Sequence, residues 1–138
     1  MPGPTPSRAA LRGGRALTAL TSVYLLVGGA SSLALPGPAR EAMACYGCDL
    51  AVVPAIGAAL LACVVVHLLP PTRVLGAVLL TAYLGGAVAT HVRIGDPPGV
   101  VAFPIAVAAA VWAGLLLRDP ALRTALAPRV DRRAPRPT

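Results

Sequence analysis

Four long apolar runs, separated by short polar stretches, dominate the sequence. They extend over about residues 16–35, 50–69, 74–91 and 100–117. An α-helix rises about 1.5 Å per residue, so roughly 20 residues cross a hydrocarbon core that is about 30 Å thick. The pattern therefore predicts an all-α fold, an integral membrane four-helix bundle.

Proline and glycine mark where these runs end. Residues 36–38 read Pro-Gly-Pro after the first run, and residues 70–71 are Pro-Pro after the second. Both sequences stop a helix. Since only a few residues separate the second run from the third, we expect these two helices to form a tight antiparallel hairpin.

A short surface helix is predicted after the fourth run. Asp119 precedes Pro120, and this order places an N-cap residue before a proline at the first helical position. The helix should extend through about Leu126, and we expect Leu122 and Leu126 to face the bilayer.

The two ends of the chain differ in composition from the apolar runs. Residues 1–15 and 128–138 are rich in proline and arginine, and such segments cannot bury a core. We predict disordered basic tails on either side of one domain, residues 16–127. Charged residues make up 12% of the chain, against about a quarter in soluble proteins, which places it in the membrane class.

The distribution of arginine predicts how the chain crosses the membrane. Only Arg40 and Arg93 lie in the loops at 36–49 and 91–99, while ten arginines lie on the side of the two termini. The positive-inside rule then places both termini in the cytoplasm of a cell (inner) membrane protein, with the two loops outside. No basic stripe is interleaved with aromatic residues, so we expect no nucleic-acid partner.

The first apolar run has two interpretations. A basic start, an apolar middle and small residues near Ala39 also fit a cleaved signal peptide. The run is longer than the usual ~7–15-residue core of such a peptide, which favours a retained helix. Both alternatives stay open at this point.

Cysteines lie in the first loop with the spacing of redox dithiols. Cys45 and Cys48 precede a helix start, but Asp49 opposes thiolate formation at Cys48. A redox dithiol, a structural disulfide and two thiols without a role are the alternatives. Cys63 lies about 22 Å further along a helix, so it should only pack. No second CxxC is present to complete a zinc site, and no metal site is expected.

The third run carries a polar stripe toward the outer face. Helical spacing places Tyr83, Ala87 and His91 on one line, with Gly86 and Thr90 beside it. Gly85 and Gly86, together with nearby alanines, have the small-residue spacing that lets neighbouring helices approach closely in lipid. We therefore expect close helix packing at these two glycines.

Charged residues follow this stripe. His91, Arg93 and Asp96 form a candidate polar site with Tyr83 and Thr90, and Glu41 from the first loop lies within reach of it. Polar groups in a membrane helix are costly and suggest function. The alternative is that His91 and Arg93 only anchor the helix at the interface. His67, at the opposite end of the second run, is interpreted as an interfacial residue.

Three stretches together resemble the DoxX-like family of small bacterial four-helix membrane proteins. They are Glu41-x-Met43-x-x-x-Gly47, the block at 80–97 with Tyr-Leu-Gly-Gly and Thr-His-x-Arg, and residues 112–123 with Leu-Arg-Asp-Pro. The resemblance implies a four-helix bundle in the inner membrane. Because family relatives include a subunit of a thiosulfate:quinone oxidoreductase, it also implies association with a quinone. The cysteine pair departs from the usual loop of the family.

The sequence thus supports two function hypotheses. The preferred one is a small subunit or accessory protein of a quinone-linked membrane redox system, with a site on the outer face. The alternative is a structural or assembly membrane protein without redox activity. Membrane lipid is the expected partner in both, with a redox partner protein or a second copy of the chain as further candidates. Quinone is the one cofactor considered, and it rests on the resemblance alone.

Overall fold

Six helices make up the part of the chain that the computed structural model describes, residues 7–47 and 49–126. The helices are α1 (Arg8–Ala34), α2 (Gly37–Cys45), α3 (Val53–Leu68), α4 (Arg73–Ile94), α5 (Pro98–Arg118) and α6 (Pro120–Leu126). These described residues contain no strand. The predicted all-α fold is confirmed.

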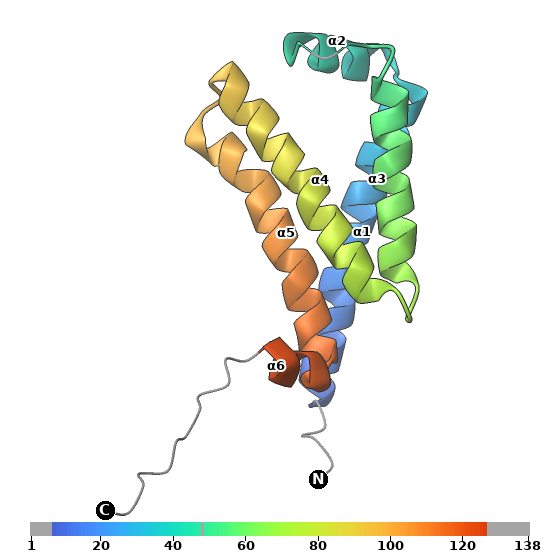
Figure 1. Ribbon diagram of the computed structural model, residues 1–138, viewed down its shortest axis with the longest axis vertical. Coiled ribbons are helices and arrows are strands. Elements are labelled where there is room, and N and C mark those ends of the chain that lie inside the picture. Colours follow the sequence, from blue (N-terminus) through green and yellow to red (C-terminus); the bar gives the residue numbers. More distant parts are fainter. Residues whose placement is uncertain (1–6, 48, 127–138) are drawn as a thin grey trace, which may run out of the picture.

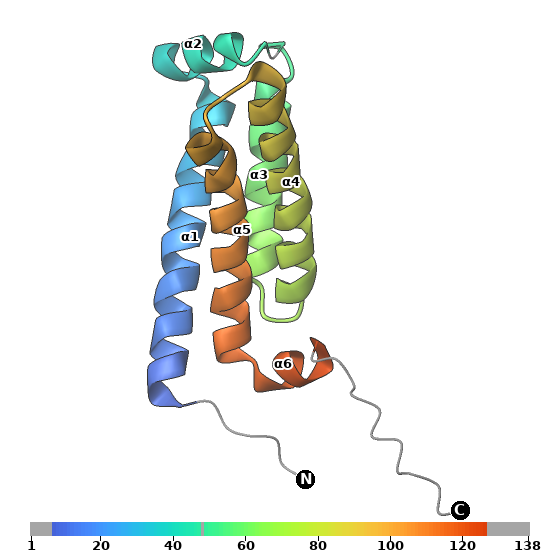
Figure 2. The same ribbon diagram turned by 90° about the vertical axis from the view of Figure 1, so that its left-hand side faces the viewer.

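Four of the helices form a ring. α1 packs against α3 and α5, and α4 packs against the same two helices on the other side. Figure 2 shows the four side by side, with α2 lying across one end and α6 at the opposite end. α1, α4 and α5 are long and apolar enough to cross a membrane, whereas α3 has only 16 residues. The fold is therefore that of a helical membrane bundle, and four crossings stay a prediction.

The first helix begins earlier than the apolar run. The side chain of Ser7 accepts a hydrogen bond from Ala10 N at 3.2 Å and caps α1, so the predicted tail is helical from residue 8 onward. The rest of the predicted tails, residues 1–6 and 128–138, lies outside the described residues. At the start of α3, Asp49 Oδ1 accepts from Ala51 N at 2.9 Å, and this turn delays the helix to Val53.

The first loop contains a helix that the pattern did not predict. α1 ends at Leu35, whose φ of 46° is left-handed, and Pro36 then caps α2, with a proline in its first turn. Proline is tolerated there because the first amides of a helix have no partner within the helix. The Pro-Gly-Pro sequence thus ends one helix and begins the next.

Glycines hold the helices close together, but not the glycines expected. A Cβ added at Gly85 or Gly86 would meet nothing within 4 Å, so the expected close packing there is wrong. At Gly57 it would lie 2.8 Å from the carbonyl oxygen of Gly29, on the neighbouring helix. The glycines at such tight crossings are Gly14, Gly29, Gly57, Gly76 and Gly114.

The core lies along the axis of the ring and continues to α6. Its buried hydrophobic members are Leu25, Leu60, Val64, Ala77, Leu80, Leu84, Val107, Val111 and Leu115. Asp119 Oδ1 accepts from Leu122 N at 3.1 Å, which confirms the predicted cap of the short helix. Leu122 packs against the core and does not face the bilayer as expected, while Leu126 is exposed.

Candidate functional site

The helix pairs separate toward the end that α2 covers. Figure 1 shows α4 and α5 leaning away from α1 and α3 in this direction. Here the structure has a cavity of about 470 Å³ and a second of about 440 Å³. The two adjoin, because both are lined by Ser32, Met43, Tyr46, Tyr83, Ala87 and His91. We call this space the outer cavity.

One wall of the outer cavity is the polar stripe of α4. Tyr83, Ala87 and His91 lie on this wall with Gly86 and Thr90, as their helical spacing predicts. The Thr90 hydroxyl donates to the carbonyl oxygen of Gly86 at 3.0 Å, which satisfies it within the helix. Gly86 lines this cavity, and this is why a Cβ added there would meet no neighbouring helix.

His91 is paired with the carboxylate of Asp96. Gly95, with a φ of 76°, ends α4, and the N–H of Asp96 returns to the carbonyl oxygen of His91 at 3.1 Å. This left-handed turn brings Asp96 Oδ2 to 2.6 Å from His91 Nδ1. Because a carboxylate only accepts, Nδ1 donates and Nε2 is left for another partner.

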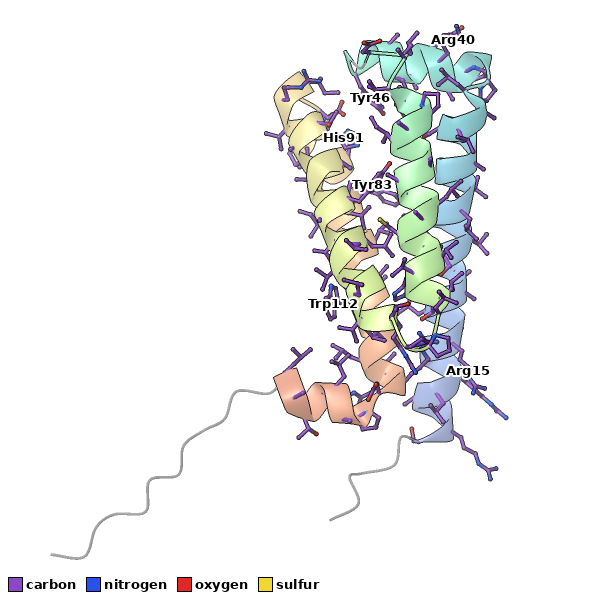
Figure 3. All side chains as sticks on the ribbon, turned by 45° about the vertical axis from the view of Figure 1, so that its right-hand side comes forward. Arg15, Arg40, Tyr46, Tyr83, His91 and Trp112 are labelled. Carbon is purple, nitrogen blue, oxygen red and sulfur yellow. The ribbon has the colours of Figure 1, made fainter. Side chains whose placement is uncertain are left out.

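The end of α2 completes the site. The ring of Tyr46 meets the ring of His91 edge to face, with centroids 5.3 Å apart. Arg93 Nη2 donates to the carbonyl oxygen of Tyr46 at 2.8 Å, and this bond joins α2 to α4. Figure 3 shows Tyr46, Tyr83 and His91 around the space between the helices. Tyr46 and Met43 were not among the predicted site residues.

The remaining predicted residues are placed elsewhere. Glu41 and Arg40 are exposed on α2, and the one ion pair among the described residues is His91–Asp96, so Glu41 does not join the site. Cys45 is exposed. Cys48 lies outside the described residues, and the alternatives for the cysteine pair stay predictions. Within the described part of the chain no His, Cys, Asp and Glu side chains gather in a metal-binding group.

The prediction of an interfacial position for His67 is wrong. His67 is 2% exposed and its Nδ1 lies 3.0 Å from the carbonyl oxygen of Arg73, so it faces the core and is not an interfacial residue. Cys63 packs against the core, as expected from its position in a helix.

Length, hydropathy and packing define the class of protein. Three apolar helices of membrane-spanning length, packed in a ring with a fourth apolar helix, characterise a multi-pass α-helical membrane protein. The sequence model of the DoxX-like family matches residues 16–114, and the chain belongs to this family. No curated protein and no solved structure matches it.

Proposed function

We propose that this DoxX-like protein is a small subunit or accessory protein of a membrane redox system and that it binds a quinone in the outer cavity. The observation that carries the proposal is His91, which is paired with Asp96 and lies on the wall of a mostly apolar cavity. The proposed location is the inner membrane, with both termini cytoplasmic and the outer cavity near the external face.

The size and lining of the outer cavity support this ligand class. The larger of its two adjoining parts, of about 470 Å³, already falls in the range of roughly 300–1,000 Å³ that is usual for small-molecule sites. Alanine, methionine and aromatic side chains provide most of the wall, and the polar groups belong to Ser32, Tyr46, Tyr83, Thr90 and His91. A lipid-soluble ring with one or two polar oxygens matches this arrangement.

The chemistry of the His91–Asp96 pair supports it further. Asp96 accepts from Nδ1 and fixes the orientation of the imidazole ring, so Nε2 can accept from a hydroxyl or, when the ring carries a second proton, donate to a carbonyl oxygen. Quinones present such carbonyls, and quinols present such hydroxyls. The hydroxyls of Tyr46 and Tyr83 supply further donors on the same wall.

Two adjacent glycines allow a matched test. Gly86 lines the outer cavity and Gly85 does not, and a Cβ at either position meets nothing within 4 Å. Leucine at position 86 should fill the cavity, whereas leucine at position 85 should not. We expect a short-chain quinone to bind the detergent-purified parent and Gly85→Leu with equal affinity, and binding to Gly86→Leu to be lost.

A second variant separates polar recognition from shape. His91→Phe keeps an aromatic ring but removes the hydrogen-bonding nitrogen Nε2, and we expect about tenfold weaker quinone binding, which corresponds to the loss of about one hydrogen bond. Val92→Ala, on an exposed neighbouring residue, serves as the control. If the folded parent binds no quinone, or if all four variants bind as the parent does, the protein has the structural or assembly role instead.

A further inference from the structure

A second, smaller cavity lies at the opposite end of the bundle, beside the turn between α3 and α4. Its volume is about 110 Å³, and it is lined by Thr18, His67, Leu68, Pro70, Arg73 and Arg118. We call it the inner cavity. Since a water molecule occupies about 30 Å³, it has room for a few waters or one small anion.

Two buried polar side chains on its wall have unsatisfied atoms. His67 is 2% exposed, and its Nδ1–H is used by the carbonyl oxygen of Arg73, but its Nε2 has no hydrogen-bond partner. Thr18 is 5% exposed, and its Oγ1 also has none. A buried polar atom without a hydrogen-bond partner destabilises the folded state, because it has lost its bonds to water. The arrangement therefore favours a ligand in the inner cavity.

Two arginines on the wall determine the charge of that ligand. Arg118 Nε donates to the carbonyl oxygen of Gly114 at 3.1 Å, and Arg73 Nε donates to that of Pro70 at 3.0 Å. These bonds use one nitrogen of each guanidinium and fix its position. The terminal nitrogens keep further donors in the planar arrangement that suits phosphate oxygens.

Among residues 7–47 and 49–126, neither Arg73 nor Arg118 forms an ion pair with an acidic side chain, and Asp119, which follows Arg118, caps α6 with its Oδ1. The ion pair found there, His91–Asp96, belongs to the outer cavity. Arg15 adds to the positive charge at the end of the bundle where the inner cavity lies, as Figure 3 shows. Basic pockets between membrane helices on the cytoplasmic side typically hold anionic headgroups.

We propose that the inner cavity binds a phosphate group, between the guanidinium groups of Arg73 and Arg118. The Thr18 hydroxyl donates to one phosphate oxygen. His67 Nε2 pairs with another oxygen, and it donates when the ring is protonated or accepts from a P–OH group when the ring is neutral. The source of the phosphate is either an anionic phospholipid headgroup or the free ion.

The test compares ligands on the full-length protein purified in a neutral detergent. Its thermal unfolding temperature is measured at increasing concentrations of phosphatidylglycerol, with diacylglycerol as the lipid control that has no phosphate. In a separate series it is measured with inorganic phosphate, with chloride at equal ionic strength as the control. We expect a phosphate-bearing ligand to raise the unfolding temperature. A rise with the phospholipid alone identifies a headgroup, and a rise with inorganic phosphate identifies the free ion.

Three variants assign this effect to the inner cavity. Arg118→Gln should weaken the apparent affinity about tenfold, as expected for the loss of a hydrogen bond to a charged group. Thr18→Val, which keeps the volume of the side chain, should also weaken the apparent affinity for the phosphate-bearing ligand. It replaces Arg118→Gln as the test variant if Arg118→Gln does not fold. Arg12→Gln removes an exposed arginine of α1 that does not line the cavity, and it should bind as the parent does.

Two results would overturn the proposal. One is a parent protein whose unfolding temperature responds equally to the phosphate-bearing ligands and to their phosphate-free counterparts, which would leave only water in the inner cavity. The other is an Arg12→Gln variant that loses as much affinity as Arg118→Gln, which would indicate a general attraction of anions to this end of the bundle.

Discussion

A single glycine determines the geometry of the histidine in the outer cavity. Gly95 is left-handed, and the turn it makes returns Asp96 to His91 across five positions of the chain. For a residue with a Cβ, this left-handed backbone conformation costs about 1–2 kcal/mol of conformational free energy. The position of the carboxylate therefore depends on the absence of a side chain one residue before it.

Gly95→Ala tests this dependence. Nothing lies within 4 Å of an added Cβ, so the penalty should come from the backbone alone and lower the free energy of unfolding by about 1–2 kcal/mol. The His91 ring signals in NMR spectra should shift as Asp96 moves. Gly99→Ala, also in open space but without positive φ, should be neutral or slightly stabilising. Equal stability of both variants would show that the turn relaxes without cost.

The sequence could predict only the part of the site that lies on one helix. Tyr83 and His91 follow from a four-residue spacing, which a helix converts directly into a shared face. Tyr46 was missed because its position depends on α2 lying across the bundle and on the bond from Arg93. Glu41 was included because it shares that loop, but it lies on the exposed side of α2.

The helices of the bundle approach one another at glycines that sequence spacing does not identify. Gly57 on α3 meets the backbone of α1, whereas Gly85 and Gly86 on α4 meet no neighbour. A small residue permits close approach but does not specify which face has a partner. The four apolar helices and the hairpin of α3 and α4 could be predicted from apolar runs and prolines, since these are local signals. The crossing points depend on tertiary packing.

Gly57→Ala and Gly85→Ala should therefore have opposite effects on stability. At position 57 the added Cβ would lie 2.7 Å from Leu33 N and 2.8 Å from Gly29 O, both of them backbone atoms. Such overpacking costs typically about 1–3 kcal/mol. At position 85 the helix should gain up to about 1 kcal/mol from the better helix former. Unfolding in mixed micelles containing a denaturing detergent measures both, and a stable Gly57→Ala variant would contradict the packing described for α1 and α3.

The whole molecule is electrostatically asymmetric along its axis. Arg40 and Arg93 lie at the α2 end. The other described arginines lie at the α6 end, on the starts of α1 and α4, the end of α5 and α6 itself. This separation is the basis for predicting a cytoplasmic α6 end. The inner and outer cavities would then open toward opposite sides of the membrane.

Cysteine labelling in intact cells tests this orientation. Cys45 is exposed on α2, and Cys63 is partly buried against the core. In a Cys48→Ser background, an impermeant maleimide should label Cys45 without permeabilisation, and Cys45→Ser should abolish the signal. A cysteine introduced by Ser7→Cys into the double Cys45→Ser, Cys48→Ser variant should react only after the membrane is permeabilised. The reverse pattern would place the outer cavity at the cytoplasmic side.

The shortness of α3 has a consequence for the surrounding lipid. Its 16 residues are about 24 Å long, against a hydrocarbon core of about 30 Å. Tilting shortens the distance that a helix spans across the bilayer and cannot lengthen it. If α3 crosses the membrane, as the predicted four crossings require, the acyl chains next to it must compress. We expect the protein to partition preferentially into thin bilayers, such as those built from shorter-chain lipids, because hydrophobic mismatch carries an energetic cost for every ångström.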